Sequence, residues 1–300
     1  MRGAGEGEDE VDIHLAEIIL SKRTKYQEIM IARTKSFGRT LFLDDLVQSS
    51  EYDDPLYHEA LVHPALVIHG RPRNVLVGGT GEGAAVREIL RHPTVERVLT
   101  VDLDDDVVQA CREHLPFFNE GVFEDPRVEY RVEGVEQTIA EAAPGSFDAI
   151  FLDITDPTDE GPAASLFSAP FLERLAPCLA DDGVLIAQCG ELEVVDLEMP
   201  RAVRSTLLEV FGWVHVAYQF VPCFHSLWGF AIASKRPLER TPVDLEARVA
   251  RLGPDLRVYT PLAHRAMLEL PPFLDAMMRT PGEVIRGRAS DVIWTYPSKK

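Results

Sequence analysis

Three features that mark other classes of protein are missing from this 300-residue sequence. No apolar run approaches the roughly 18 residues that a membrane-spanning helix needs. The opening stretch, MRGAGEGEDE, has neither the basic region nor the apolar core of a signal peptide. The four cysteines form no CxxC pair, which argues against a zinc site and against a disulfide framework. We therefore expect a cytoplasmic protein in a reducing compartment that does not engage a membrane.

Positive charge is also scarce, with 30 Lys and Arg residues against 49 Asp and Glu residues and a net charge of −19. Contacts to a phosphate backbone need clustered Lys and Arg, so nucleic acid is not an expected partner. An acidic surface attracts cations, although such a surface can also serve solubility alone. The charge therefore bears on function only if carboxylates converge on one site.

The order of sequence patterns divides the chain into four parts. Residues 1–10 are rich in Gly and Glu and are predicted to be disordered. Residues 11–53 form a small N-terminal β-hairpin domain, because β-prone runs from residue 26 onward alternate with turn signals at FG and DD. Residues 54–235 form a Rossmann-like domain that opens with a helix at DPLYHEALVHPALVIH. Residues 236–300 form a helical extension.

Short apolar runs alternate with helical patterns within residues 54–235. Five runs read as strands: NVLVGG, RVLTVDL, VEYRV, DAIFLDI and GVLIAQCG. The stretches between them have helical periodicity, which predicts a parallel sheet covered by helices on both faces. Two further strands lie close together, VHVAYQFVP and SLWGFAIASK, and suggest an antiparallel hairpin that ends the sheet. This α/β layout matches a class I methyltransferase-like fold better than a standard dinucleotide-binding fold.

A glycine-rich turn joins the first of these strands to its helix. The stretch VLVGGTGEGAAVREIL places Gly78, Gly79, Gly81 and Gly83 where the backbone can approach a ligand closely. Asp102 ends the next strand about 20 residues further on, where a carboxylate can accept hydrogen bonds from ribose hydroxyls. A tight strand–helix turn would need similar glycines, but the whole context favours a nucleoside site. The acids at 104–106 are expected to be a solvated helix start.

Glu82 lies inside this glycine loop and narrows the choice of ligand. A carboxylate there would repel a pyrophosphate, and equally the carboxylate of an S-adenosylmethionine tail. Decarboxylated S-adenosylmethionine keeps the nucleoside and the sulfonium but ends in an amine, which Glu82 would attract. The alternative is that Glu82 is only an acid in the first turn of a helix, stabilised by the helix dipole.

The fourth strand runs directly into a group of carboxylates. In FDAIFLDITDPTDEGP, Asp153 ends the strand and Asp156 follows three residues later. Carboxylates beside a sulfonium suit chemistry on an amine, because an aliphatic amine has a pKa near ~10 and must lose a proton before it attacks carbon. One carboxylate can hold the cation while another accepts the proton.

As an ordered set, the motifs resemble the polyamine aminopropyltransferases, the family of spermidine, spermine and thermospermine synthases. The resemblance covers about residues 20–235. It rests on these stretches: KYQEI, FGRTLFLDDLVQ, YHEALVHPAL, GGTGEG, VDLD, DITDP, EGP and WGFAIASK. It implies transfer of an aminopropyl group from decarboxylated S-adenosylmethionine to a polyamine, with no further cofactor and no metal. It also implies a homodimer or homotetramer.

The resemblance assigns roles to individual residues. Asp153 would accept the proton, and Asp156 and Tyr57 would hold the acceptor amine. The remaining substrate-binding residues are Gln27, His58 and Glu82 for the aminopropyl donor, Asp102 for its ribose, and Pro162 in a loop closing over the site. The family usually carries an acid after the third strand for adenine, and here Glu133 and Gly134 occupy that region.

Three positions depart from the usual spermidine synthase pattern. Glu82 stands where Asp is common, Asp102 where Glu is common, and Phe224 where a Tyr commonly faces the acceptor. These variants resemble the thermospermine synthase branch, so spermidine is favoured as acceptor, with putrescine next. Two other functions stay open on the residues alone: an S-adenosylmethionine-dependent small-molecule methyltransferase, and a non-catalytic polyamine-binding protein.

Overall fold

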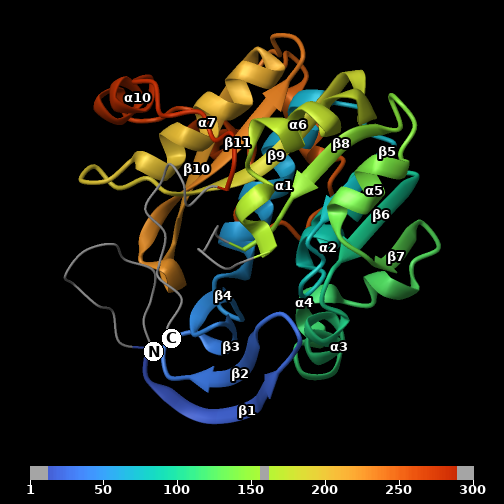
Figure 1. The fold of residues 1–300 in the computed structure, drawn as a ribbon, viewed down its shortest axis with the longest axis vertical. Coiled ribbons are helices and arrows are strands. Elements are labelled where there is room, and N and C mark those ends of the chain that lie inside the picture. The colour runs from blue at the N-terminus through green and yellow to red at the C-terminus, as the bar shows by residue number, and fades with distance from the viewer. Residues whose placement is uncertain (1–12, 156–161, 289–300) are drawn as a thin grey trace.

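The computed structural model describes residues 13–155 and 162–288 and contains two β-sheets (Figure 1). The segment 1–10, predicted to be disordered, lies outside the described residues, and so does Asp156. The smaller sheet is formed by the N-terminal strands, drawn in blue in Figure 1, and the larger sheet by the rest of the chain.

The N-terminal sheet has four antiparallel strands in sequence order. They are β1 (Leu15–Arg23), β2 (Glu28–Thr34), β3 (Gly38–Leu43) and β4 (Leu46–Ser50). The turn between β3 and β4 is the DD signal of the sequence, because Asp44 and Asp45 both adopt positive φ, as a two-residue hairpin turn requires. The turn signals did not mark β1, which is the outer strand of this sheet.

The larger sheet has seven strands in the order β10-β11-β9-β8-β5-β6-β7. Its strands are β5 (Asn74–Gly78), β6 (Arg97–Asp102), β7 (Val128–Val132), β8 (Phe147–Leu152), β9 (Leu179–Glu191), β10 (Trp213–Val221) and β11 (Ser226–Ser234). Strands β5 to β9 pair in parallel, while β11 is antiparallel to both β9 and β10. The predicted methyltransferase-like sheet with a terminal hairpin is confirmed.

Helices cover both faces of the larger sheet. The helices up to residue 211 are α1 (Asp54–His69), α2 (Ala84–Leu90), α3 (Asp105–His114), α4 (Pro116–Asn119), α5 (Val135–Glu141), α6 (Ala169–Leu175) and α7 (Glu198–Phe211). After the last strand come α8 (Leu245–Ala250), α9 (Pro261–Met267) and α10 (Pro272–Met278). Single 3₁₀ turns occur at η1 (Val122–Glu124), η2 (Pro162–Ser165), η3 (Ala176–Cys178) and η4 (Pro222–Phe224).

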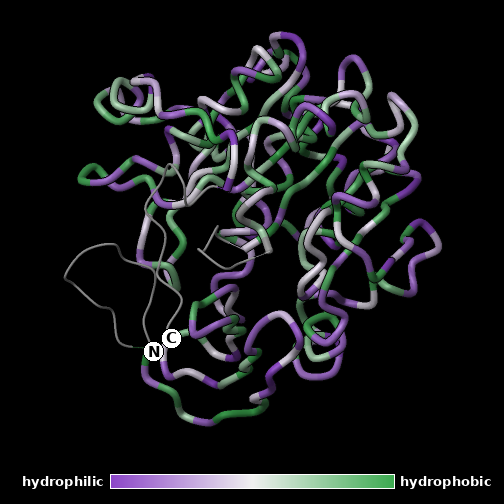
Figure 2. The backbone as a smooth tube through the Cα atoms, in the orientation of Figure 1, coloured by the Kyte–Doolittle hydropathy of each residue, from purple (hydrophilic) through white to green (hydrophobic). Residues whose placement is uncertain are grey.

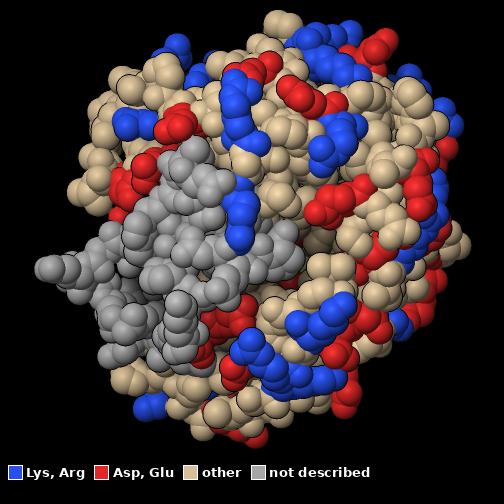
Figure 3. Space-filling model, viewed as in Figure 1, with Lys and Arg blue, Asp and Glu red and all other residues tan. Residues whose placement is uncertain are grey.

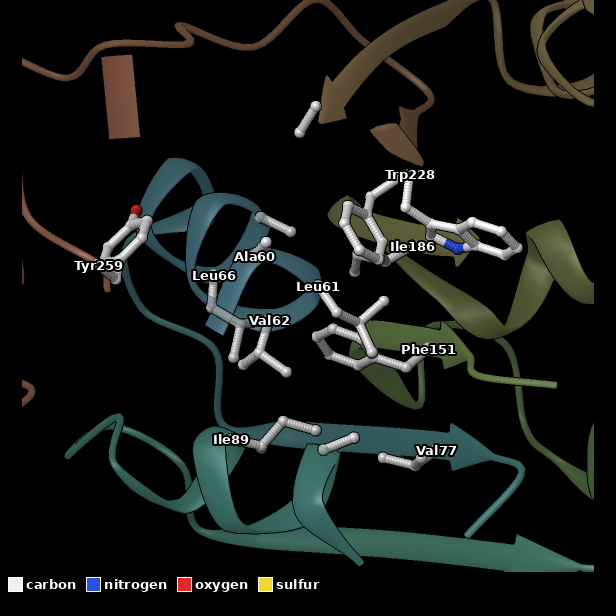
Figure 4. Close-up of a cluster of buried hydrophobic side chains, with 14 of the residues drawn as sticks. Ala60, Leu61, Val62, Leu66, Val77, Ile89, Phe151, Ile186, Trp228 and Tyr259 are labelled. Atoms are coloured by element: carbon white, nitrogen blue, oxygen red, sulfur yellow. The ribbon is translucent and has the colours of Figure 1, made fainter. Parts of the chain in front are cut away.

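Alternation along the strands divides the core into two layers. Val77 and Phe151 face α1 and α2, whereas their neighbours Leu76 and Ile150 face α5, α6 and α7. In Figure 4, Leu61 from α1 lies over Phe151 on the sheet. Both strand faces are apolar, as a sheet covered on both sides requires. A third cluster joins β2 and β3 to α3 and α4, which fixes the small sheet over the carboxyl ends of the parallel strands.

The C-terminal segment is anchored to α1 by one buried carboxylate. Glu59 accepts three backbone N–H groups, from Arg257 (2.8 Å), Val258 (2.9 Å) and Tyr259 (2.6 Å). Tyr259 is buried in the same core cluster as α1, and the two lie side by side in Figure 4. The extension therefore packs on the back of the helix that supplies Tyr57 and His58.

Neither hydrophobic residues along the chain nor charges of one sign on the drawn face gather in one region. Hydrophobic and hydrophilic residues alternate along the backbone in Figure 2. None of the helices in the described ranges is long and apolar enough to cross a membrane. On the face drawn in Figure 3, Lys and Arg lie interspersed with Asp and Glu.

Candidate active site

A cavity of about 240 Å³ lies at the carboxyl ends of the parallel strands, beneath the N-terminal sheet. Its floor is made by residues that follow β5, β6, β7 and β8, and its roof by β3, β4 and the turn before β2. The sequence-predicted residues that line it are Gln27, Tyr57, His58, Gly79, Gly81, Glu82, Asp102, Glu133, Gly134 and Asp153. Residues far apart in the sequence thus meet at the edge where open α/β sheets bind ligands.

Gly79 is the position at which the glycine loop most needs a glycine. Its φ is +90°, and a Cβ there would lie 2.0 Å from the carbonyl oxygen of Asp153. The backbone N–H of Asp153 donates to the Gly78 carbonyl at 2.9 Å, so β5 and the end of β8 are held together. Gly78 closes β5 and Gly83 precedes α2, and neither is among the residues that line the cavity.

Asp102 shapes the glycine loop through its own carboxylate. One oxygen accepts the backbone N–H groups of Thr80 (2.9 Å) and Gly81 (3.0 Å), and the other accepts that of Asp104 (2.9 Å). Burial raises the pKa of Asp102, and these three hydrogen bonds oppose that rise. The carboxylate therefore stands in the cavity wall in a fixed orientation.

Asp104 is a pocket residue that the sequence analysis assigned wrongly. It was expected to be part of a solvated helix start, but its side chain is buried and only Asp106 of the three acids is exposed. Its Oδ2 accepts hydrogen bonds from Thr24 Oγ1 (2.6 Å) and from Gln27 Nε2 (3.1 Å). Asp104 thereby holds Gln27 at the cavity. Its place two residues after β6 could have indicated from the sequence that it lies in the pocket.

Asp153 lies deep in the molecule and keeps part of its surface open to the cavity. Its Oδ1 accepts a hydrogen bond from the Tyr57 hydroxyl at 2.9 Å. Burial raises the pKa of Asp153 to about 6, an effect that His58 opposes and the charge of Glu82 reinforces. At neutral pH this is a carboxylate whose proton affinity is well above that of an ordinary Asp.

His58 lies between two carboxylates. Its Nδ1 is 2.7 Å from Asp54 Oδ1, and its Nε2 is 3.3 Å from Glu82 Oε1. Burial lowers the pKa of His58, but the hydrogen bonds to Asp54 and Glu82 outweigh burial and raise it to about 10. His58 is therefore an imidazolium that donates at both ring nitrogens.

Aromatic side chains form another wall of the cavity. Phe224 packs against Tyr57 and Trp228, with ring centroids 5.8 Å and 4.6 Å away. Trp228 is buried, and it lines the cavity as well. Gln188 also lines the cavity and was not among the sequence-predicted residues, although its place near the carboxyl end of β9 could have indicated it.

Four further substrate-binding positions were predicted, and three of them belong to the described residues. Glu133 lines the cavity but accepts a hydrogen bond from Thr138 Oγ1 at 2.7 Å, and Gly134 precedes α5. Pro162 begins η2. Asp156, expected to hold the acceptor amine, falls outside the part of the chain that is described. Among the described residues no group of three or more His, Cys, Asp or Glu is arranged to hold a metal ion.

Two family models match this chain. One, described as the spermine/spermidine synthase domain, covers residues 54–242. The other, described as the spermidine synthase tetramerisation domain, covers residues 10–51. Together they cover the N-terminal sheet and the whole of the larger sheet.

Curated sequences and solved structures agree with these matches. A polyamine aminopropyltransferase from Aeropyrum pernix is 39% identical over 221 residues, which are 74% of this chain and 70% of that protein. One from Pyrobaculum neutrophilum is 36% identical over 272 residues, 86% and 90% of the two chains. The spermidine synthase of Thermotoga maritima superimposes with a TM-score of 0.81 at 26% identity over 90% of each chain. A spermidine synthase in complex with the transition-state analogue AdoDATO gives a TM-score of 0.82 at 27% identity, over 90% of this chain and 91% of that one.

Proposed function

Because the chain belongs to the spermine/spermidine synthase family, we propose that it transfers the aminopropyl group of decarboxylated S-adenosylmethionine to a polyamine. The observation that carries the proposal is the half-buried carboxylate of Asp153, which lies at the carboxyl end of β8 among Tyr57, His58 and Glu82. In this reaction the acceptor nitrogen forms a bond to the aminopropyl carbon while the bond from that carbon to sulfur breaks. The sulfur leaves as a neutral thioether, and the acceptor nitrogen gives up one proton.

Asp153 is the proposed proton acceptor. A general base works best when its pKa is close to the working pH, and burial raises the pKa of Asp153 to about 6. The Tyr57 hydroxyl donates to one oxygen of Asp153 and leaves the other for the amine. The acceptor is cationic in water, so a carboxylate both attracts it and takes its proton. Tyr57 and Asp156 complete the proposed acceptor site.

The donor is proposed to lie along the glycine loop. Gly79 and Gly81 allow the backbone to approach the nucleoside, and Asp102 is oriented to accept hydrogen bonds from ribose hydroxyls. Glu82 and Gln27 would contact the amine end of the aminopropyl arm, with His58 beside them. Glu133 and Gly134 are the proposed neighbours of the adenine, and Pro162 belongs to the segment proposed to close the site.

Spermidine is the proposed preferred acceptor, with putrescine next. The wall beside Tyr57 is made of Phe224 and Trp228, whose rings provide apolar surface along which the methylene chain of a longer amine can lie. Phe224 offers no hydroxyl to an amine at the position where spermidine synthases commonly carry a Tyr.

Product analysis tests the acceptor. Purified protein and decarboxylated S-adenosylmethionine would be incubated with putrescine, agmatine or spermidine, and products identified by mass spectrometry with authentic thermospermine and spermine as chromatographic standards. We expect the highest kcat/KM with spermidine. A higher value with putrescine would reject the acceptor assignment and keep the reaction. The Phe224→Tyr variant is expected to shift the preference toward putrescine.

We also propose that the chain is a homo-oligomer assembled through the domain placed at residues 11–53. Strand β1 is one of the two edge strands of its sheet, and Ile18 on it is 57% exposed. An open strand edge with an apolar side chain is a ready surface for a second copy. Light scattering after size exclusion would give the mass, and a dimer or tetramer is expected. A monomer at micromolar concentration would contradict the proposal.

A further inference from the structure

A chain of charged side chains runs from the back of α1 into the cavity, and it begins at Asp54. This carboxylate, on the first turn of α1, is almost fully buried, with 2% of its side chain exposed. One of its oxygens lies 2.7 Å from His58 Nδ1. Arg87 of α2 binds both oxygens at 3.1 and 3.0 Å, and Arg257 of the C-terminal segment binds Oδ2 at 3.1 Å. The aminopropyl-transfer roles proposed above do not use Asp54.

The partners of Asp54 are themselves held in place. Arg87 donates from Nε to Glu88 at 2.8 Å and from Nη1 to the Phe118 carbonyl at 2.7 Å. Arg257 is positioned by the backbone hydrogen bond of its own N–H to Glu59. Such a fully paired carboxylate has few alternative positions, so its side chain gives a rigid reference point for His58.

The geometry around His58 makes its protonation depend on Asp54. An imidazole that faces a carboxylate at each nitrogen satisfies both only when it carries both protons. The charged groups that face it are Asp54 from α1, Glu82 from the glycine loop and Asp153 from β8. Arg87 acts on it through Asp54. Without Asp54, Nδ1 loses the carboxylate that faces it, and a neutral His58 can still donate to Glu82 from Nε2.

We propose that Asp54 is a positioning residue that keeps His58 doubly protonated and directed at Glu82, so that Asp153 takes its proton beside a fixed positive charge. The proposal rests on the aminopropyl transfer proposed above. The imidazolium offsets the repulsion between Glu82 and Asp153, and it engages one oxygen of Glu82 at 3.3 Å. Asp54 touches neither substrate and acts only through His58.

The pH dependence of the Asp54→Asn variant tests this role. The amide leaves His58 neutral, so Asp153 loses a favourable charge and its pKa rises. If the pKa of Asp153 rises by about one unit, kcat/KM relative to the unmodified chain falls roughly fivefold near pH 6 and less than twofold near pH 8. The amine substrates titrate in the same way with both chains, so the ratio of the two kcat/KM values at each pH cancels that effect. The His58→Gln variant is expected to show the same profile, and the double variant no further change.

The matched control is Asp244→Asn. Asp244 lies directly before α8 and, like Asp54, pairs with a cation four residues on, Arg248 at 2.7 Å, but it lies on the exposed surface. Its kcat/KM ratio is expected to stay flat across the same pH range. A loss in Asp54→Asn that is equal at all pH values, or that adds to the loss in His58→Gln, would mean that Asp54 is only structural and would overturn the proposal.

A measurement on the unmodified full-length chain keeps the proposal testable if Asp54→Asn fails to fold. The ¹⁵N chemical shifts of the His58 ring, assigned with His58→Gln, are expected to be those of an imidazolium at pH 8. A neutral ring at that pH would overturn the proposal. The ring measurement needs no turnover, so the absence of aminopropyl product would count against the proposed reaction alone.

Discussion

At the scale of single residues, Asp153 joins two properties that the proposed reaction needs. It lies where the strand ends, so its carboxylate reaches the cavity, and it lies deep enough for burial to raise its pKa to about 6. An ordinary surface Asp would be a weaker base, with a pKa lower by roughly two units. Burial on β8 therefore supplies proton affinity that the residue type alone does not have.

Replacing Asp153 by Asn removes the base while preserving the shape of the side chain. We expect kcat to fall by at least about 100-fold, the usual contribution of a positioned general base. The melting temperature should stay the same or rise, because the raised pKa means that the buried charge destabilises the fold at neutral pH.

Asp148→Asn is the control for that substitution. Asp148 lies near the amino end of β8, whereas Asp153 follows the carboxyl end of the same strand. There it accepts hydrogen bonds from the backbone N–H groups of Arg73 and Asn74. Steady-state kinetics should show kcat for this variant within about twofold of the unmodified chain. Equal losses in the two variants would count against a base at Asp153.

The same pKa predicts the acid side of the pH profile. A carboxyl with a raised pKa is deprotonated above about pH 6 and gains its proton as pH falls through that value. The kcat at saturating substrate should therefore drop about tenfold per pH unit below about pH 6. A profile that stays flat down to about pH 4.5 would identify an ordinary exposed carboxylate as the group that titrates.

At the scale of elements, periodic patterns were enough to predict the strands and helices around the site. The glycine loop, the end of β6 and the end of β8 were located because parallel strands deliver their carboxyl ends to one edge. Side-chain partners were harder to predict, since they depend on tertiary contacts between distant segments. The hydrogen bond that Gln27 donates to Asp104 and the anchoring of residues 257–259 by Glu59 have no local sequence signal.

Gly79 shows how one element positions another. In Gly79→Ala the new methyl group would meet the Asp153 carbonyl oxygen, which is backbone and cannot rotate away. We expect kcat/KM to fall by at least about tenfold, because small displacements of catalytic groups are costly. Gly145→Ala is the control: its φ is also positive, at +70°, but nothing lies within 4 Å of the added Cβ. Similar kinetics for both variants would show that backbone strain, rather than the contact with Asp153, matters at Gly79.

Glu59 holds the C-terminal segment to α1. Glu59→Ala leaves three backbone N–H groups without their acceptor, so the free energy of unfolding should fall by about 3 kcal/mol. Denaturant titration would measure the change. Glu246→Ala, which removes an exposed ion pair with Arg265, should change it by less than about 1 kcal/mol. Equal changes would mean that Glu59 contributes no more than a surface charge.

At the scale of the whole molecule, negative charge matters because some of it converges. The face drawn in Figure 3 mixes both signs, so net charge alone does not locate a site. The larger sheet instead brings Glu82, Asp102, Asp104 and Asp153 into one cavity, and the N-terminal sheet closes that cavity from the other side. A ligand that is cationic at both its sulfonium and its amine ends matches such an enclosure.

The most direct test of the central claim is a competition between two donors. The unmodified chain would be given spermidine with equal amounts of decarboxylated and ordinary S-adenosylmethionine, and the mass gained by the amine would be measured. The account predicts that the amine gains one aminopropyl group and no methyl group, with an equal amount of methylthioadenosine formed, and that Asp153→Asn nearly abolishes both products. A methylated amine formed from ordinary S-adenosylmethionine, without aminopropyl product, would contradict it.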